Sequence, residues 1–305
     1  MPLLHISGES REPLDSFAAF WGEWALMSPV TVVLAFMLGA YLFGLYRLNS
    51  RANSQADRAD ASPISIGRIV LTLLGFSALA FSLVGPADAL AEDQFFLHMI
   101  QHLLLTLIAA PLLLAASPVA AYLWSLPSDI RYTVAGSLAR RGKVNRVMRK
   151  LTFPKTAIVI YILTMYVWHL PTMYEAAIHN EPLHYLEHLV FFGVGVMFWW
   201  PVAGPAPVRS QLSYPQRLLY IMLAFTPSAA LGAFLTLVDT TLYTHYEATP
   251  MHWGVGAKED QSIGGLIMWV PGGFILLAAA TVLFFKWYES ESKGSRYKPR
   301  VHPKQ

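Results

Sequence analysis

The feature that most constrains this chain is a series of long apolar segments separated by short polar ones. Several of these segments reach the roughly 20 residues that a helix needs to cross the hydrocarbon core of a bilayer. Of the 305 residues, 55% are hydrophobic and only 13% are charged, whereas about 25% charged is usual in a soluble domain. The apolar residues come in blocks and not in amphipathic stripes. The predicted fold class is therefore all-α, a polytopic membrane protein.

Seven apolar blocks predict a bundle of seven transmembrane helices within residues 26–287. In chain order the blocks cover residues 26–46, 66–85, 95–124, 156–170, 183–202, 217–238 and 263–287. Pro111, Pro227 and Pro271 lie inside three of the blocks. Each removes one backbone hydrogen bond from its helix, which predicts a kink there.

The basic residues predict how the bundle is oriented. All of the 22 lysines and arginines except Arg11 and Lys258 fall on the side that carries the C-terminus. Cytoplasmic loops carry an excess of Lys and Arg, so we expect a multi-pass protein of the cytoplasmic (inner) membrane with the N-terminus outside and the C-terminus in the cytoplasm. The basic charge then reflects topology and does not predict nucleic-acid binding.

This topology divides the chain into three parts. Residues 1–25 form an extracytoplasmic interfacial segment, residues 26–287 the transmembrane domain, and residues 288–305 a basic cytoplasmic tail. The transmembrane domain includes a basic cytoplasmic loop at 125–155, whose lysines and arginines run from Arg131 to Lys155. Its spacing suits a basic amphipathic helix on an anionic membrane face, which makes membrane lipids expected partners.

Two of the apolar blocks begin with a pair of histidines four residues apart. His98 and His102 form the first pair, and His184 and His188 form the second. Residues at this spacing share one face of a helix, so the two pairs could surround a metal ion with four imidazoles if the helix ends meet. Polar side chains inside a crossing helix normally face the bundle and need partners. The topology also places every histidine except His302 on the outer side.

The ligand chemistry follows from the residue types available. The chain has no cysteine, so metal ligands are limited to His, Met, carboxylate and backbone groups. Imidazole suits zinc, copper, iron and nickel, and thioether sulfur selects Cu(I). Met99 and Met268 lie near the outer side, although core filling explains any one methionine more simply. Glu187 lies on the same side of its helix as His184 and His188, either as a ligand, as a neighbour that sets a tautomer, or as a solvated interfacial residue.

Four ordered motifs carry a resemblance to a known family. They are HMIQHLLL at 98–105 with Pro111 and Pro118 after it, WHLPTMYEAA at 168–177, LHYLEHLVFF at 183–192 with FWWPV at 198–202, and DQSIGGLIMWVPG at 260–272. Together they resemble the seven-helix CtaG family of cytochrome c oxidase assembly proteins, in the branch linked to caa-type oxidases. The resemblance covers about two thirds of the chain.

The resemblance implies a non-enzymatic assembly factor that helps copper, expected as Cu(I), to reach a haem-copper oxidase. Its expected partners are cytochrome c oxidase subunits or other copper chaperones, and a homo-oligomer is compatible with it. Carried over residue by residue, the motifs point to one set of metal-site residues: His98, His102, His169, His184, His188, Glu187, Asp260 and Met268.

Two other readings fit the histidine pairs. One is an intramembrane zinc-dependent hydrolase, in which three imidazoles activate water and Glu187 or Asp260 serves as the general base. The other is a b-type haem protein with histidines from two facing helices as axial ligands, although each pair would then leave one histidine over. Bound zinc with hydrolytic activity, or a haem absorption spectrum, would distinguish them from a copper carrier.

Overall fold

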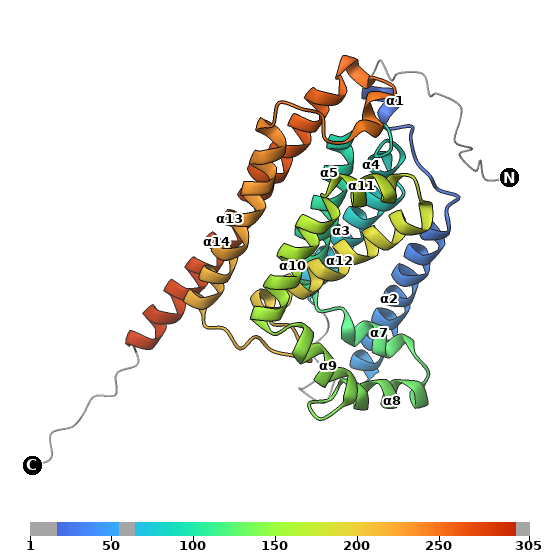
Figure 1. Cartoon of the computed structure of the whole chain (residues 1–305). Helices are drawn as coiled ribbons and strands as arrows, with labels where there is room; N and C mark the ends of the chain where they lie inside the picture. The colour runs from blue at the N-terminus through green and yellow to red at the C-terminus, as the bar shows by residue number, and fades with distance from the viewer. Residues whose placement is uncertain (1–16, 55–64, 297–305) are drawn as a thin grey trace, which may run out of the picture.

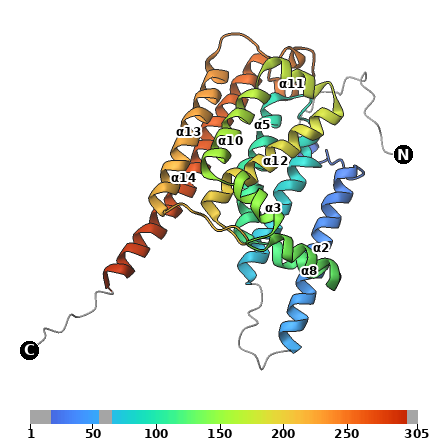
Figure 2. The same cartoon turned by 60° about the horizontal axis from the view of Figure 1, so that its bottom comes forward.

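The computed structural model describes residues 17–54 and 65–296, and every regular element within these ranges is helical. Figures 1 and 2 show the helices gathered into an elongated bundle. The predicted all-α class is confirmed. The first part of the predicted interfacial segment (to residue 16), the linker at 55–64 and the end of the predicted basic tail (from 297) lie outside the described residues.

Six helical segments are long and apolar enough to cross a membrane, and a bent pair of helices would make a seventh. Five of the six are built on α2 (Pro29–Ser54), α3 (Ile66–Leu83), α12 (Glu181–Ala203), α13 (Tyr214–Leu237) and α14 (Ala257–Arg296). The bent pair is α9 (Lys143–Leu151) with α10 (Pro154–Trp168), which meet at 62°. With 15 residues, α10 is slightly shorter than the roughly 17–25 residues of an ordinary crossing helix, so the turn after α9 and the last residues of α9 complete the span.

The remaining span contains a change of helix type that Pro111 explains. It consists of α5 (Phe95–Leu103), the π-helix η1 (Leu104–Ala109) and α6 (Ala110–Ala116). In this π-helical register the Ala110 N–H bonds to the Leu105 carbonyl, and Pro111 has no N–H for the Thr106 carbonyl. The Trp199 indole N–H donates to that carbonyl at 2.9 Å. The disruption predicted at Pro111 therefore takes the form of a π-helix, which often marks a functional site.

The same span ends earlier than predicted. Ser117 has a left-handed backbone (φ 50°), and a short helix, α7 (Val119–Ser125), follows it. The residue before a proline is disfavoured in the right-handed helical region, and Pro118 comes next. The predicted continuous helix over 95–124 is therefore wrong: it is broken at Ser117.

Short elements cover the two ends of the bundle. At one end lie α1 (Phe17–Phe20), α4 (Pro86–Ala89), α11 (Pro171–Ile178), η2 (Thr244–Glu247) and η3 (His252–Gly254). At the other end α8 (Ser128–Leu138) and α9 replace the single basic amphipathic helix expected over 125–155. Figure 1 shows α8 and α9 opposite α1 and α11. The Asn145 amide donates to the Leu138 carbonyl at 3.0 Å and so ties α9 to the end of α8.

Candidate metal centre

The end of α5 that carries His98 and His102 is anchored by a carboxylate from α14. The Phe95 and Phe96 N–H groups donate to the two carboxylate oxygens of Asp260, at 2.6 and 2.8 Å. The first N–H groups of a helix lack intrahelical partners, and a negative charge at this end is favourable. Asp260, expected among the metal-site residues, therefore lies at the α5 N-terminus as its cap and positions the helix.

A close approach of backbones brings α12 against this span. A Cβ atom on Gly195 would lie 2.9 Å from the Thr106 Cα and 3.0 Å from the Thr106 carbonyl oxygen. Real Cβ atoms essentially never come that close to backbone, so only glycine fits here. The Trp199 indole bond to the Thr106 carbonyl fastens the same contact. The two histidine-bearing helices are thus held at short range.

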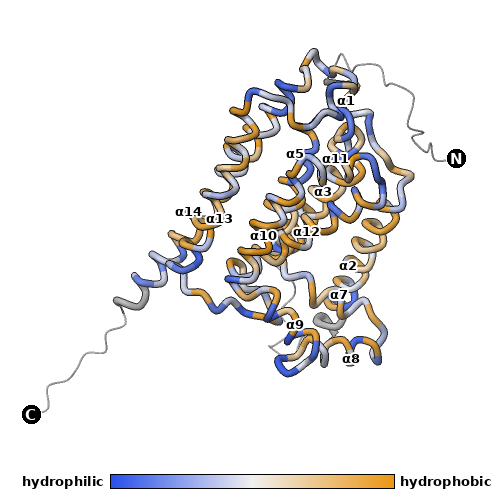
Figure 3. The backbone as a smooth tube through the Cα atoms, in the orientation of Figure 1, coloured by the Kyte–Doolittle hydropathy of each residue, from blue (hydrophilic) through white to orange (hydrophobic). Residues whose placement is uncertain are grey.

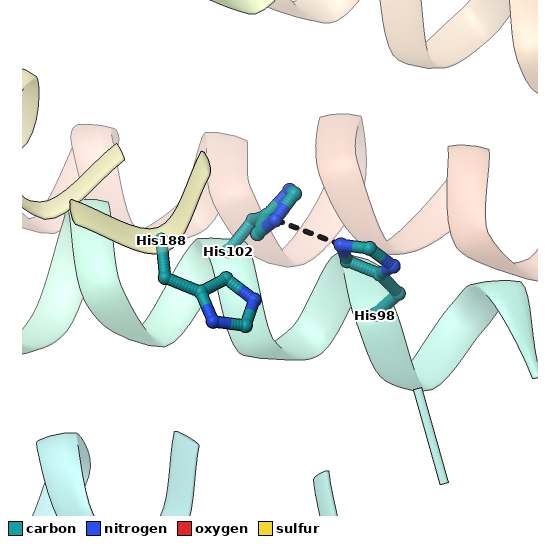
Figure 4. A group of neighbouring side chains, drawn as sticks. All are labelled: His98, His102 and His188. Atoms are coloured by element: carbon teal, nitrogen blue, oxygen red, sulfur yellow. Dashed lines mark hydrogen bonds between the residues drawn. The ribbon is translucent and has the colours of Figure 1, made fainter. Parts of the chain in front are cut away.

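The two histidine pairs meet between α5 and α12. The Nε2 atoms of His98 and His102 lie 2.9 Å apart, and the ring of His188 lies 5.8 Å from that of His102, centre to centre. Figure 4 shows these three rings, two from α5 and one from α12. The His184 ring lies 5.1 Å from the His98 ring. All four imidazoles are buried.

Glu187 adds a carboxylate to the imidazoles. One of its oxygens lies 3.6 Å from His98 Nε2 and the other 3.7 Å from His102 Nε2, and the side chain is fully buried. Two overlapping groups, His98 with His102 and His188, and His98 with His184 and Glu187, each hold their ligand atoms within 4.8 Å of one another. These groups could hold a metal ion.

A chain of hydroxyl groups sets the tautomer of His98. The Tyr246 hydroxyl donates to the Ala91 carbonyl at 2.8 Å, so in its 2.7 Å contact with Tyr174 the donor is the Tyr174 hydroxyl. With its only proton used, the Tyr174 oxygen must accept the hydrogen bond that joins it to His98 Nδ1 at 2.9 Å. The proton of neutral His98 is therefore on Nδ1. Its Nε2 therefore carries the lone pair that a metal-ligating histidine requires, and in this structure that lone pair accepts the 2.9 Å hydrogen bond from His102 Nε2.

Several buried polar atoms of the cluster have no hydrogen-bond partner among the described residues. They are His102 Nδ1, His184 Nε2, His188 Nε2 and both carboxylate oxygens of Glu187. Each buried polar atom without a partner lowers the stability of the fold by about 1–3 kcal/mol. Five such atoms in one place therefore need a physical explanation. A cation bound between them would satisfy nitrogen and oxygen lone pairs together. The donor set therefore fits a metal ion.

His169 lies beside the cluster and faces a thioether. Its Nδ1 lies 2.6 Å from the Met165 carbonyl, which can only accept, so Nδ1 carries the proton. Its Nε2 then presents a lone pair to Met99 Sδ at 3.3 Å. Neither of these two atoms has a proton to donate, and both are ligands that Cu(I) accepts.

A cavity of about 40 Å³ borders this second pair of donors. Met99, His102, His169 and Met268 line it together with apolar side chains. A space of this size holds only a few water-sized atoms. Met268 therefore lies on the cavity wall beside His169, whereas His102 belongs both to the cavity and to the cluster.

The loop that supplies Tyr246 is fastened to α11 by Glu175. One Glu175 carboxylate oxygen accepts bonds from the Thr244 N–H and the Thr244 hydroxyl, each at 2.8 Å. The bond from the Thr244 hydroxyl is the main cause that lowers the pKa of Glu175 below its ordinary value. The tyrosine chain was not found by sequence reasoning: Tyr174 lies inside the WHLPTMYEAA motif, but nothing local marks Tyr246.

The fold and the cluster define a multi-pass helical membrane protein with a buried His/Glu group that could hold a metal ion. The model of the family described as cytochrome c oxidase caa3 assembly factor (Caa3_CtaG) matches residues 39–290, and the chain belongs to this family. The family resemblance drawn from the four motifs is thereby confirmed.

Three relatives are mycobacterial proteins described as uncharacterized. Those of Mycobacterium bovis and Mycobacterium tuberculosis are each 26% identical over 276 residues, covering 90% of this chain and 40% of theirs. The one from Mycobacterium leprae is 22% identical over 286 residues, covering 91% of this chain and 41% of its own. The chain thus spans about two fifths of the length of these relatives. No solved structure matches it.

Proposed function

We propose that this protein is an assembly factor for cytochrome c oxidase that binds copper at the His/Glu cluster and passes it on. The observation that carries the proposal is the convergence of potential ligand atoms: His98 Nε2, which keeps its lone pair because Nδ1 donates to Tyr174, lies in one group with the unpartnered atoms of His184, His188 and Glu187. The family assignment supplies the process, because the matching model describes caa3 oxidase assembly factors.

The choice of Cu(I) rests on the donors beside the cluster. Thioether sulfur is a soft ligand that selects Cu(I), whereas zinc in proteins is held by Cys, His and carboxylate. Met99 and His169 face each other with two lone pairs at 3.3 Å, and His102 links them to the cluster by lining the same cavity. We infer that the copper ion moves between the His/Glu cluster and the Met99–His169 pair.

Both other readings of the histidine pairs fit less well. A hydrolase needs a metal position open to its substrate, yet His98 and Glu187 have no exposed surface. A haem ring would have to fit between imidazoles of the two facing helices, yet the His98 and His184 rings lie only 5.1 Å apart, centre to centre. Copper binding and transfer therefore remain the function that this geometry supports best.

We propose the orientation that the basic residues predict, with the N-terminus outside. The cluster then lies near the outer surface of the bacterial cytoplasmic membrane, where extracytoplasmic copper arrives. The partners would be an oxidase subunit or another copper chaperone that meets the α11 and η2 end. Tags placed in the exposed turn between α11 and α12 and in the α8–α9 hairpin would test this: the first should be accessible from outside only, and cytoplasmic labelling of the first would contradict it.

The function is tested by metal binding and by oxidase assembly in parallel. Purified protein is titrated with Cu(I) against a chromogenic chelator, for the wild type and for a His98→Ala, His188→Ala double variant. We expect the double variant to lose at least 100-fold in Cu(I) affinity, since it removes two ligands of one group. In cells that lack the endogenous protein, the wild type should restore copper-loaded oxidase and the double variant should not.

A matched control uses two histidines outside the cluster. His179 is exposed and His245 is half-buried, both near the same end of the bundle but outside the cluster, so a His179→Ala, His245→Ala variant should bind Cu(I) as the wild type does. Wild-type protein that holds zinc but not Cu(I), or a cluster variant that supports full oxidase assembly, would refute the proposal.

A further inference from the structure

Five cationic side chains surround a cavity at the end of the molecule opposite the histidines. The cavity has a volume of about 670 Å³. It lies between the α8–α9 hairpin and the loop that joins α12 to α13. Its wall is formed by Arg140, Arg141, Arg146, Arg149, Lys150, Phe153 and Gln211.

These cations have no anionic partners among the described residues. The ion pairs found there involve His98, His102 and His252 and none of the five. Asp129 is the one acidic residue of the whole segment from 125 to 155, and the Ser128 hydroxyl donates to it. Like charges that converge on one space repel each other, so the cavity favours an anion.

The helix beside the cavity has the pattern of one that lies in a membrane interface. Arg146, Arg149 and Lys150 are spaced i, i+3, i+4 and share one face of α9. Val144, Val147 and Leu151 share another face, and they are exposed to 43, 56 and 42%. An apolar face left about half exposed, next to a cationic face, is typical of interfacial helices.

The depth of the cavity follows from the element that comes next. α9 leads through Phe153, which is exposed to 43%, directly into the crossing helix α10 at Pro154. The cavity therefore lies where hydrocarbon gives way to water, at the level of lipid phosphates. Figure 3 shows the hydrophilic stretches of this hairpin beside the apolar helices. Guanidinium groups match phosphate oxygens bidentately.

We propose that this cavity binds the phosphate of an anionic phospholipid headgroup, with the acyl chains lying along the exposed apolar face of α9 and Phe153. The cationic cavity selects the charge of the ligand, and the apolar rim selects a lipid over a free anion. The site is independent of the metal centre, because the two lie at opposite ends of the bundle (Figure 1).

The test measures lipid binding by the full-length protein in neutral detergent. Native mass spectrometry gives the dissociation constants for phosphatidylglycerol and phosphatidylcholine, and the unfolding midpoint is followed with each lipid and with inorganic phosphate. We expect phosphatidylglycerol to bind more than tenfold tighter than phosphatidylcholine. An Arg146→Gln, Arg149→Gln variant should lose about 30-fold in phosphatidylglycerol affinity, as expected for two cations near a lipid surface.

The control removes the same charge from the same segment. Lys143 and Lys155 are exposed and do not line the cavity, so a Lys143→Gln, Lys155→Gln variant should lose less than about threefold, since their charges act only at a distance. An Arg140→Gln, Arg141→Gln variant gives a second, independent removal of cavity charge and should resemble the first.

Three results would overturn the proposal. Equal losses in the cavity and control variants would mean general attraction to a basic surface. Equal binding of phosphatidylcholine would remove the selection by charge. Stabilisation by inorganic phosphate as large as that by phosphatidylglycerol would assign the cavity to a free anion.

Discussion

The hydrogen bond between His98 and Tyr174 allows a sharp prediction about metal affinity. In a Tyr174→Phe variant the ring of residue 174 is kept, but His98 Nδ1 loses the oxygen that accepts its proton at 2.9 Å. Loss of such a partner typically weakens metal binding by about 10–100-fold, or about 1.4–2.8 kcal/mol. Because both side chains are fully buried, water cannot replace the lost oxygen, and we expect the upper half of this range.

The next tyrosine tests the direction of the hydrogen-bond chain. In a Tyr246→Phe variant, Tyr174 no longer has an oxygen to donate to and can turn its proton toward His98 Nδ1. That would move the ring proton of His98 to Nε2 and block the ligand atom. We therefore expect Tyr246→Phe to weaken Cu(I) binding by about tenfold, although Tyr246 does not touch the cluster.

The assay is a Cu(I) titration against a competing chelator, with Tyr220→Phe as the matched control. The Tyr220 hydroxyl donates to the Phe198 carbonyl at 3.0 Å, so this variant also loses one buried hydrogen bond, away from the cluster. It should cost about 1 kcal/mol of stability and leave Cu(I) affinity within twofold. Wild-type affinity in Tyr174→Phe would refute the tautomer argument.

Three further predictions concern the contacts that hold the cluster together. Gly195→Ala should destabilise the protein by about 1–3 kcal/mol and weaken Cu(I) binding, because the added methyl group overlaps the Thr106 backbone. In the control, Gly193→Ala on the same helix, the methyl group meets nothing within 4 Å, and the change should be neutral. Equal thermal unfolding midpoints for the two variants would contradict this. Asp260→Ala should lower the free energy of unfolding by about 1–2 kcal/mol, because the α5 N-terminus loses its cap, and Asp260→Asn should lower it less. Chemical or thermal unfolding in detergent would measure both. An unchanged midpoint in the alanine variant would count against the cap. Folding lowers the pKa of Glu175, so its carboxylate stabilises the fold fully above its ordinary pKa of about 4.5, and this contribution is lost as pH falls through the lower folded pKa. The difference in unfolding midpoint between wild type and Glu175→Ala should therefore shrink below pH 4.5. A difference that stays constant with pH would contradict the assignment.

The local patterns of the sequence were sufficient for the class of protein and for the faces of the helices. Hydropathy acts over a window of about 20 residues, so the all-helical membrane fold and most of the crossing segments followed from it. The i, i+4 spacing is equally local, which is why His98 with His102 and His184 with His188 could each be placed on one face. The family motifs added His169 and Met268 as further candidates.

Only the tertiary structure decided which helix ends and side chains meet. Gly195 sets the separation of α12 from η1, and Asp260 turned out to cap α5 from a helix more than 150 residues away. Tyr246 reaches His98 through Tyr174, and Met99 faces His169, across elements distant in the chain. Hydropathy and helical periodicity are short-range properties, whereas these contacts depend on packing between helices, so sequence could nominate the ligands but not their partners.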